Sequence, residues 1–398
     1  MSSLKKIAVL GAGIYNTLVY QKLREGGFYS IAVDGNKDAP AAKFADEFVH
    51  LNFTDKEVLL QYFSGHEVHG ILPINDWGTI PAAYVSQKLG LKGISEEAAM
   101  ASCDKGIMRN TWKKAGIPVP DYFVFSNLQE LKNGIKITGF PCVVKPTYSG
   151  GGGRGISVLK NENDVEWAYD FAKPYVKNGR FICESFVEGT ELTIESVSVN
   201  GEVHILAISD KYKPDLRTRV ATSLNYPAAL SEAQENLVRE TVKKAVASLG
   251  IHTGMAHTEA IMKGMELKLV ETGARGGGSH IFPLIIEAVS GINAPAIMAQ
   301  LLTGEEPNLQ NIQKRGCVYR FFNPGPGILR SVQHMDEVRQ WPGVLEIGML
   351  KKPGEEVGNL KNSFERAGHL VTSGEDRNAA WELANKAEAY IQFEVEAI

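Results

Sequence analysis

Two glutamates in the second half of the chain have the spacing of a metal-binding pair. Glu259 and Glu271 each lie in an apolar segment, and a Lys263-Gly264 turn between the segments predicts that they pair as antiparallel strands. Like charges that face each other are unfavourable without a cation, and carboxylate oxygens suit Mg2+ that also binds nucleotide phosphates. We therefore expect Glu259 and Glu271 to hold Mg2+, with Mn2+ as a substitute. The alternative is a carboxylate pair exposed to water.

A glycine-rich loop follows a lysine at the end of a buried-type strand, Phe140–Lys145. Because glycine has no Cβ, such a loop can bring backbone N–H groups against phosphate oxygens, and Lys145 can neutralise their charge. The loop is not a Walker A motif, because the GK[ST] ending is missing and a strand, Ile156–Leu159, follows instead of a helix. We expect a phosphate-binding loop, and the alternative is a flexible surface hairpin. The expected phosphate contacts are Ser149, Gly150, Gly151, Gly152, Gly153 and Gly155.

Two further clusters suit nucleotide chemistry. The strand Phe181–Phe186 runs into the acidic segment Glu184–Glu191. Backbone that crosses the edge of an adenine can read the base, and a nearby carboxylate can accept the ribose hydroxyls, although acids at strand ends are often only solvated. Arg275 follows Glu271 closely, where it can stabilise charge on a transferring phosphoryl group.

The N-terminal segment carries an incomplete dinucleotide fingerprint. Gly11 and Gly13 follow a strand and open a helix, and Asp34 ends the next strand. The third glycine position is Asn16, whose side chain would hinder close helix–strand packing. We therefore favour a Rossmann-like domain that binds no dinucleotide over an NAD-dependent oxidoreductase.

The candidate site residues lie on predicted strands and helices whose order differs between the two parts of the chain. Strand and helix signals alternate over the first hundred or so residues, which predicts a parallel sheet. A helix is expected over Ser95–Met108, and Asn200-Gly201 predicts a hairpin between two later strands. Long and terminal helices are expected over Ser231–Leu249 and Asn378–Gln392.

Composition excludes several classes of protein. A chain of 398 residues predicts two to three domains. The net charge of −4, with no basic block, argues against an extended nucleic-acid interface. The N-terminal apolar run is too short for a signal peptide, and no uncharged run is long enough to cross a membrane. The four cysteines are scattered without a C-x-x-C pair, which favours a reducing cytoplasm over a disulfide framework or a zinc site.

The chain resembles the ATP-grasp superfamily, whose members include biotin carboxylase, D-alanine–D-alanine ligase, the large subunit of carbamoyl phosphate synthase and the L-amino acid ligases. The resemblance covers nearly the whole chain and implies a fold of α/β and α+β character in three parts. These are a Rossmann-like domain over 1–97, an ATP-grasp domain over 98–310 with metal strands at 254–271, and a small β-rich C-terminal domain over 311–398. The residues that carry it, in order, are Lys105, Lys145, the loop 149–155, Glu184–Glu191, Glu259, Glu271 and Arg275.

The resemblance also implies residue roles. Lys105 and Lys145 would hold the phosphates of ATP, with Lys211 or Lys213 as a further phosphate-binding lysine. One departure is Gly273, which stands where the family often has a metal-binding asparagine, so the number of Mg2+ ions stays open. Adenine would be read by Glu184, Ser185, Phe186 and Val187, ribose by Glu191, the metal would be held by Glu259 and Glu271, and Arg275 would contact an acyl phosphate.

The implied activity is a Mg-ATP-dependent carboxylate–amine ligase. A small carboxylate would attack the γ-phosphate, and an amine would then displace phosphate from the acyl phosphate. The carboxylate is expected to bind along Gly276, Gly277, Gly278, Ser279 and His280, because three glycines can leave backbone N–H groups open to an anion. The alternative is that these glycines only allow the chain to turn before the helix Ile281–Val289.

Two other readings stay open. One is an enzyme of the carbamoyl-phosphate or purine type, which the N-terminal GAGIYN turn and Asp34 resemble. Another is a non-catalytic nucleotide-binding module, which the full set of lysines, glutamates and arginine argues against. Relatives of this architecture are commonly dimers, so a homodimer in the cytoplasm is expected, with no membrane or nucleic-acid partner.

Overall fold

The N-terminal region forms a four-stranded parallel sheet in the order β3-β2-β1-β4, as its alternating pattern predicts. In this computed structural model the described residues are 4–150, 153–213, 220–358, 360 and 365–397. Both faces of the sheet are covered, one by helices α2 and α3, the other by α1 and α10. The bounds are β1 (Lys6–Leu10), β2 (Tyr29–Asp34), β3 (Glu47–His50), β4 (Gly70–Pro73), α1 (Thr17–Glu25), α2 (Lys56–Ser64), α3 (Asp76–Lys88) and α10 (Ala294–Leu302).

The N-terminal sheet shares its core with a distant part of the sequence. Val19 and Leu23 of α1 pack in one cluster with Ile297 and Leu301 of α10. Helix α10 follows helix α9 (Ile286–Ser290) and belongs by sequence to the central region. The first region is therefore anchored on the central one by buried apolar contacts, which fixes the position of its loops over the rest of the chain.

The central element is an eight-stranded antiparallel sheet in the order β13-β12-β9-β10-β11-β14-β18-β16. The predicted hairpin turn is confirmed, since Asn200 and Gly201 both have positive φ, 50° and 89°. Helix α8 (Glu232–Ser248) covers one face of strands β9, β10, β12 and β13 with an apolar cluster. The strands are β9 (Thr190–Val199), β10 (Glu202–Tyr212), β11 (Ser223–Tyr226), β12 (Gly254–Lys263), β13 (Glu266–Gly273), β14 (Gly316–Phe322), β16 (Val344–Met349) and β18 (Gly368–Gly374).

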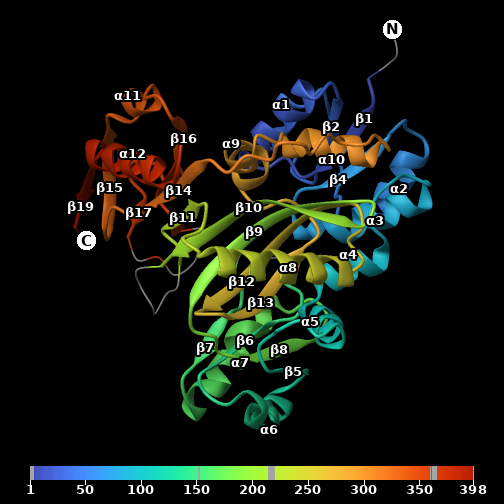
Figure 1. Cartoon of the computed structure of the whole chain (residues 1–398), viewed down its shortest axis with the longest axis vertical. Helices are drawn as coiled ribbons and strands as arrows, with labels where there is room; N and C mark the ends of the chain where they lie inside the picture. The colour runs from blue at the N-terminus through green and yellow to red at the C-terminus, as the bar shows by residue number, and fades with distance from the viewer. Residues whose placement is uncertain (1–3, 151–152, 214–219, 359, 361–364, 398) are drawn as a thin grey trace.

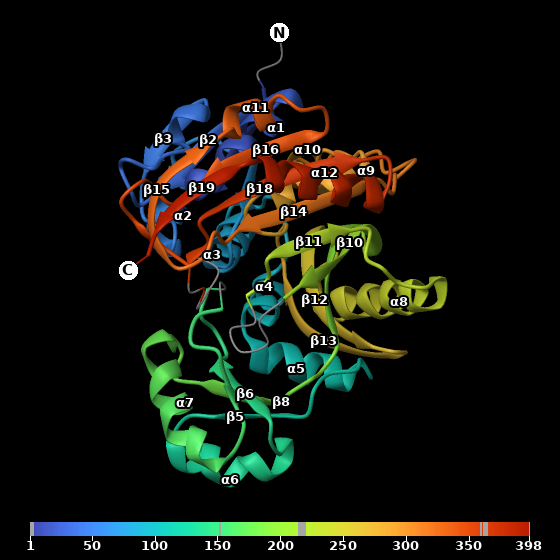
Figure 2. The same ribbon diagram turned by 90° about the vertical axis from the view of Figure 1, so that its left-hand side faces the viewer.

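A separate lobe carries the glycine loop. Its sheet has the order β5-β8-β6-β7, and helices α6 and α7 cover one face. Figures 1 and 2 show this lobe below the large sheet, with the glycine loop reaching up from the β6–β7 edge. The bounds are β5 (Tyr122–Phe125), β6 (Cys142–Pro146), β7 (Ser157–Leu159), β8 (Phe181–Ser185), α6 (Leu128–Thr138) and α7 (Val165–Ala172).

The helix expected over Ser95–Met108 is in fact two helices, α4 (Glu96–Cys103) and α5 (Lys105–Lys114). Asp104 lies between them in extended backbone and caps α5, because its carboxylate accepts hydrogen bonds from the N–H groups of Gly106 (2.9 Å) and Ile107 (3.0 Å). The break places Lys105 in the first turn of α5, where its side chain reaches Glu271.

The C-terminal region continues the large sheet and adds a smaller one. Strand β14 pairs with β11, so residues after 311 extend the same sheet that carries the central strands. The small sheet has the order β17-β15-β19, and α12 packs on it and on β14 and β18. The bounds are β15 (Gly327–Gln333), β17 (Glu356–Val357), β19 (Gln392–Glu396), α11 (Met335–Arg339) and α12 (Arg377–Tyr390).

In the part of the chain that the structure describes, no single helix has the length and apolar character needed to cross a membrane. By length and composition alone, one pair bent by 108°, Ile281–Ser290 with Ala294–Leu302, passes that test together.

Candidate functional site

A buried ion triad sits where the glycine-loop lobe meets helix α5. Glu184, on β8, is 3% exposed and binds both Lys145 (2.5 Å, Nζ to Oε2) and Arg109 (2.5 Å, Nε to Oε1). Burial alone would raise the Glu184 pKa, but Arg109 and Lys145 outweigh it and lower the pKa to about 2. Burial lowers the pKa of Lys145. Glu184 thus fixes the position of Lys145. Its buried carboxylate is not accessible to the adenine that it was expected to bind.

The two candidate metal-binding glutamates are brought together by a β-bulge. Glu259 and Glu271 stand opposite each other in register, and the register shifts directly after them, so that Ala260 pairs with Leu269. Leu267 and Leu269 pack under α8, and strict alternation would turn Glu271 to that apolar face as well. The bulge at Val270 reverses the alternation and turns Glu271 to the open face.

Both metal-site candidates have lysine partners. Lys105 Nζ lies 2.7 Å from Glu271 Oε1, and Lys211 Nζ lies 2.5 Å from Glu259 Oε1. The pKa of Glu259 is well below its usual value, because Lys211 and His257 outweigh the effect of burial. Within the described ranges, no group of three or more His, Cys, Asp or Glu side chains gathers as a metal site. Two carboxylates nevertheless fit Mg2+, which is commonly held by one or two carboxylates plus substrate phosphates.

Glu191 contacts both Lys211 and Lys213, the two candidates for a further phosphate-binding lysine. Its contacts therefore do not decide between them. Lys211 Nζ lies 2.5 Å from Glu191 Oε1, and Lys213 contacts Glu191 Oε2. Burial lowers the pKa of Lys211 less than Glu191 and Glu259 raise it, so its net shift is upward, whereas for Lys213 burial prevails and the pKa falls.

Arg275 reaches across to the N-terminal region. Its Nε lies 2.6 Å from Asp76 Oδ1, and Asp76 opens helix α3. The Asp76 pKa is lowered, because Arg275 outweighs burial. Gly273 faces the same pair, since a Cβ there would lie 3.4 Å from Asp76 Oδ1 and 3.6 Å from the Arg275 side chain. Asp76 therefore fills the space beside Gly273 where the family often has asparagine.

The glycine loop rests on the N-terminal region. Gly150 has φ +70°, and a Cβ there would lie 2.0 Å from the Trp77 ring, so no other residue fits without a shift. The Trp77 ring packs edge-on against Tyr148, with centroids 5.3 Å apart. Ser149 is buried, Gly153 and Gly155 also have positive φ, and Gly151 and Gly152 lie outside the described residues.

Two residues of the segment expected to bind adenine already form hydrogen bonds within the protein. The Ser185 hydroxyl accepts a hydrogen bond from Asp121 N (3.0 Å), and Phe186 N donates to Pro141 O (3.0 Å). Phe186 N is therefore not free for the adenine base, whereas the Ser185 hydroxyl only accepts here and keeps its O–H as a donor. The expectation for Val187 is neither supported nor opposed by these contacts.

The substrate loop needs a correction at Gly277. Its N–H donates to Glu195 Oε2 (3.0 Å), so this N–H is not open to an anion. A Cβ on Gly277 would lie 2.6 Å from Glu195 Oε1, and one on Gly276 would lie 2.2 Å from the Phe282 ring, so close packing requires both glycines. Gly278 is exposed with open space around it, Ser279 is exposed with φ 56°, and His280 is buried.

Sequence reasoning missed several residues of the site. Arg109 lies four residues after Lys105, which is one helical turn on the same face, so its position was a usable signal. Glu195 is a fully buried acid in an apolar strand, and it contacts His257, whose Nε2 also lies 3.9 Å from Glu259. Burial lowers the pKa of His257, but Glu195 outweighs it and raises the pKa to about 9.

The N-terminal glycine turn uses its own acid. Asp34 Oδ2 accepts from Ala12 N (2.7 Å), and Asp34 Oδ1 accepts from Asn36 N (2.8 Å). Asp34 thus closes the N-terminal glycine turn through backbone hydrogen bonds.

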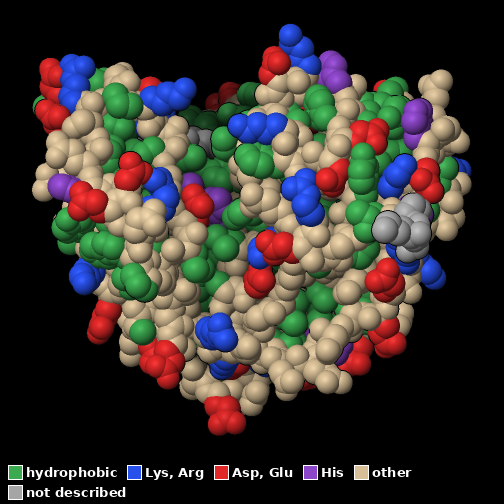
Figure 3. All heavy atoms as spheres, turned by 90° about the horizontal axis from the view of Figure 1, so that it is seen from above, with side chains coloured by type: hydrophobic (Ala, Val, Ile, Leu, Met, Phe, Trp, Pro, Cys, Tyr) green, Lys and Arg blue, Asp and Glu red, His purple; other side chains and the backbone are tan. Residues whose placement is uncertain are grey.

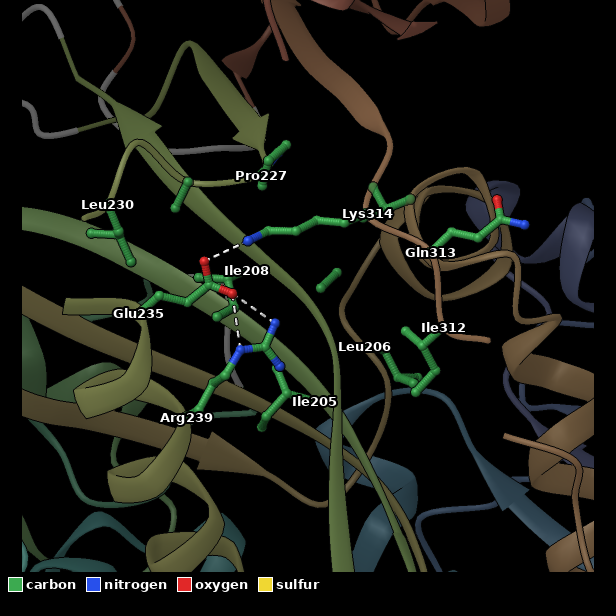
Figure 4. Close-up of a pocket in the computed structure, with 13 residues that line it drawn as sticks. Ile205, Leu206, Ile208, Pro227, Leu230, Glu235, Arg239, Ile312, Gln313 and Lys314 are labelled. Atoms are coloured by element: carbon green, nitrogen blue, oxygen red, sulfur yellow. Dashed lines mark hydrogen bonds and ion pairs between the residues drawn. The ribbon is translucent and has the colours of Figure 1, made fainter. Parts of the chain in front are cut away.

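A further hollow lies away from these residues, between α8, β10 and the segment 312–314. It has a volume of about 230 Å3 and is lined by both apolar and charged side chains. At its edge Glu235 pairs with both Lys314 (2.5 Å) and Arg239 (2.8 Å) (Figure 4). Its charges are thus satisfied by one another, and we assign it no chemistry.

Comparison with known families gives two matches along the chain. The family described as ATP-grasp domain matches residues 110–290, and L-amino acid ligase C-terminal domain 2 matches residues 320–396.

Curated relatives and solved structures agree with these matches. The formate-dependent phosphoribosylglycinamide formyltransferase of Shewanella amazonensis is 28% identical over 71% of this chain and 72% of its own length. The alanine–anticapsin ligase of Bacillus subtilis is 29% identical over 69% of this chain and 64% of its own length. The L-amino acid ligase of Bacillus licheniformis has the same fold, with a TM-score of 0.85 and 20% identity over the full length of both chains. Phosphoribosylglycinamide synthetase of Anaerococcus prevotii has a TM-score of 0.78 and 22% identity, over 99% of this chain and 100% of its own.

Proposed function

Since this chain belongs to the ATP-grasp superfamily, in its carboxylate–amine ligase branch, we propose that it joins a small carboxylate to an amine, using Mg-ATP and releasing ADP and phosphate. The carboxylate is activated as an acyl phosphate, which the amine then attacks. The match of residues 320–396 to an L-amino acid ligase domain favours an amino acid or a similar small acid as the carboxylate.

The observation that carries this proposal is the pairing of lysines with the two candidate metal-binding glutamates, because these pairs can exchange partners. Lys105 holds Glu271 and Lys211 holds Glu259. A nucleotide polyphosphate supplies anions for the lysines, and Mg2+ supplies a cation for the carboxylates, so both partners of each pair can change without an uncompensated buried charge. The donor set therefore fits Mg-ATP as a unit. Bound there, Mg2+ would polarise the γ-phosphate and offset charge.

Other side chains of the site bind the phosphates, position Lys145 or exclude water. Lys145, Lys105 and Lys211 neutralise phosphate charge, while Glu184 and Arg109 act as positioning residues for Lys145. Glu191, whose carboxylate contacts Lys211 and Lys213, would accept the ribose hydroxyls, as the family resemblance implies. Gly150 lies against Trp77, and a glycine loop that covers the phosphates from there would exclude water and protect an acyl phosphate from hydrolysis.

Arg275 is the proposed catalytic residue. Its guanidinium lies beside Gly273, two residues after Glu271, and Asp76 holds it there. At this position it can stabilise charge on the phosphoryl group as the carboxylate oxygen attacks in line. Gly278, Ser279 and His280 lead away from Arg275, and we propose that the substrate lies along them.

A second candidate activity is favoured by the relatives named formate-dependent phosphoribosylglycinamide formyltransferase, at 28% identity over 287 residues. In that case the carboxylate would be formate and the amine a phosphoribosylglycinamide. Both candidates use the same ATP chemistry, so only the substrates separate them.

The test is an ADP-release assay over pools of carboxylates and amines, with formate plus phosphoribosylglycinamide as one arm. We expect release to require both a carboxylate and an amine, and the active arm to assign the substrate class. ADP release that is independent of every carboxylate and amine would contradict a ligase, and no release in any arm would favour a nucleotide-binding module.

We also propose that the chain works as a homodimer in the cytoplasm. The four cysteines are buried and unpaired in the structure, which suits a reducing compartment. Light scattering at micromolar concentration tests the dimer, and a monomer alone would contradict it.

A further inference from the structure

Glu195, in the middle of strand β9, is a carboxylate that the fold buries completely. Figure 3 shows acidic side chains spread over one face of the molecule, where water solvates them. Glu195 is 0% exposed, and Leu192, Ile194 and Val197 of the same strand pack in apolar clusters. A buried carboxylate is costly unless it is paired and hydrogen-bonded, so its partners indicate what it does.

The two oxygens of Glu195 contact two different parts of the site. His257 stands opposite Glu195 in the register of β9 and β12, and its Nδ1 contacts Glu195 Oε1. The N–H of Gly277 donates to Glu195 Oε2 (3.0 Å). One carboxylate therefore joins strand β12, which carries Glu259, to the proposed substrate loop 276–280.

His257 lies between Glu195 and the candidate metal site. Side chains two residues apart on a strand point to the same face, and His257 Nε2 lies 3.9 Å from Glu259 Oε1. Because Nδ1 of the ring contacts Glu195, the ring cannot turn away from Glu259 without taking a partner from a buried carboxylate. Glu195 thus fixes the orientation of the ring beside Glu259.

The second partner of Glu195 belongs to the loop that follows Arg275. Gly277 lies two residues after Arg275, whose guanidinium Asp76 holds. A Cβ on Gly277 would lie 2.6 Å from Glu195 Oε1, so the backbone of the loop runs directly against the carboxylate. A misplacement of about 1 Å can cost about 100-fold in rate, so a contact that fixes this loop has a direct consequence for catalysis.

We propose that Glu195 and His257 are positioning residues, which hold Glu259 and the substrate loop 276–280 in one fixed arrangement. The proposal rests on the proposed ligase function and assigns neither residue a contact with substrate. For phosphoryl transfer, the substrate carboxylate on the loop must face the phosphoryl group held near Glu259 and Glu271. A single buried carboxylate that contacts both sides sets this distance, and its substitution should disturb both sides together.

Two substitutions separate the contacts of this pair. Glu195→Ala removes both contacts of the carboxylate, because Gly277 N and His257 Nδ1 lose their partner. His257→Asn keeps an amide N–H near the position of Nδ1 but has no group at the position of Nε2. It therefore keeps a partner for Glu195 and loses the contact beside Glu259.

Two measurements report on the two sides of Glu195. The affinity for Mn2+ in the presence of ADP, measured by EPR spectroscopy, reports on the candidate metal site and needs no turnover. The KM for the carboxylate, measured by ADP release, reports on the loop. The matched control is His204→Asn on strand β10, where His204 Nε2 lies 3.7 Å from the exposed Glu202. Melting temperatures confirm that each variant is folded.

We expect Glu195→Ala to weaken Mn2+ binding and to raise the KM for the carboxylate, each by about tenfold or more. His257→Asn should weaken Mn2+ binding and leave this KM near the wild-type value, and His204→Asn should match wild type in both. A role in folding alone would lower kcat through the fraction of folded enzyme and leave the Mn2+ affinity and the KM unchanged. That result for Glu195→Ala, or unchanged Mn2+ binding in His257→Asn, overturns the proposal.

If Glu195→Ala does not fold, Glu195→Gln replaces it, since the amide oxygen keeps an acceptor for Gly277 N while the contact with His257 changes. Mn2+ binding that is weaker in Glu195→Gln and in His257→Asn than in His204→Asn sustains the proposal, and unchanged binding overturns it. The same comparison decides the proposal if the wild type releases no ADP with any carboxylate or amine, in which case the proposed function fails on its own.

Discussion

At the scale of residues, the site is built from charges that are already neutralised in pairs. Lys145 and Arg109 share Glu184, Lys105 holds Glu271, and Lys211 lies between two glutamates. Some of these pairs can exchange partners when a nucleotide and a metal enter, but the Glu184 triad is too deeply buried to open. Glu184 therefore contributes to stability, and its contribution depends on pH.

Glu184→Gln should destabilise the protein by about 3 to 5 kcal/mol at pH 7, because Arg109 and Lys145 would be left buried without a counter-ion. The pKa of Glu184 is lowered from 4.5 to about 2 on folding. Its stabilisation is therefore fully present above pH 4.5 and is lost as the pH falls toward 2. Urea unfolding at pH 7, 5, 4 and 3 should show the difference from wild type shrinking only below about pH 4.5.

The matched control is Glu166→Gln in the same lobe, where an exposed pair with Lys132 should contribute little to stability, because solvent screens it. A difference for Glu184→Gln that is as large at pH 3 as at pH 7, or no larger than that of the control, would contradict the buried triad.

Arg275→Ala should lower kcat by about 100-fold or more and change ATP affinity less than about threefold, because the charge of Arg275 matters most in the transition state. Steady-state kinetics and nucleotide titration check both quantities. Arg239→Ala, at an arginine paired with Glu235 on helix α8, is the control and should change neither. If ATP binding is lost and kcat is kept, Arg275 is a nucleotide clamp, and the carboxylate pocket must be sought near Asn75 and Asp76.

The residue types of the site could be read from the sequence, but their partners could not. A lysine after a buried strand and two glutamates on paired strands are local patterns, and each was found. Asp76 meets Arg275 only because the N-terminal region packs on the central one, and that contact joins residues far apart in the chain. The hydrogen bond from Gly277 N to Glu195 is equally non-local, and it closes an N–H that local pattern suggested was open.

At the scale of elements, two irregularities place the chemistry. The bulge at Val270 turns Glu271 out of the apolar face under α8, and the break at Asp104 separates α4 from α5. Periodicity predicted the strands and the helical region well, because both signals extend over many residues. Periodicity could not predict the helix break at Asp104 or the bulge at Val270, because each irregularity involves a single residue.

Asp104 should be required for the position of Lys105. Its carboxylate caps α5 and also accepts from Arg180 (2.8 Å) and Asn178 (2.8 Å). Asp104→Ala should cost about 2 to 4 kcal/mol of stability, because the cap is lost and buried donors lose their acceptor. It should also raise KM for ATP. Chemical unfolding and ADP-release kinetics measure the two effects.

Asp376→Ala is the matched control for this variant, because Asp376 caps the distant helix α12 through Ala379 N (2.9 Å). It should cost about 1 kcal/mol and leave KM for ATP unchanged. If Asp104→Ala lowers stability but leaves KM equal to that of the control, the break between α4 and α5 serves the fold alone.

At the scale of the whole molecule, the N-terminal region acts as a platform for the others. Trp77 supports Gly150, Asp76 holds Arg275, and Tyr15 meets His280. The fold class and the order of the three regions follow from sequence pattern and family resemblance. The continuous sheet through β11 and β14 does not, because pairing of distant strands leaves no local signal.

Nucleotide binding should therefore stabilise the whole chain. Mg-ATP at a concentration of 100 times its Kd should stabilise the folded protein by about 2.7 kcal/mol, seen as a rise in Tm. NAD and NADP should produce no rise, because the Asp34 carboxylate already closes the N-terminal turn. A rise with NAD and none with Mg-ATP would reject the assignment of these residues to an ATP site.

The most direct test of the central claim follows oxygen from the carboxylate to phosphate. A pool of L-amino acids labelled with oxygen-18 in the carboxyl group is incubated with Mg-ATP and the enzyme, and the released phosphate is analysed by mass spectrometry. Activation as an acyl phosphate predicts one carboxylate oxygen in each phosphate released, and Glu271→Ala should release almost none, since it removes one of the two metal-site carboxylates. Phosphate released by the wild type without the label would show that water, and not a carboxylate, accepts the phosphoryl group, and would contradict the ligase mechanism.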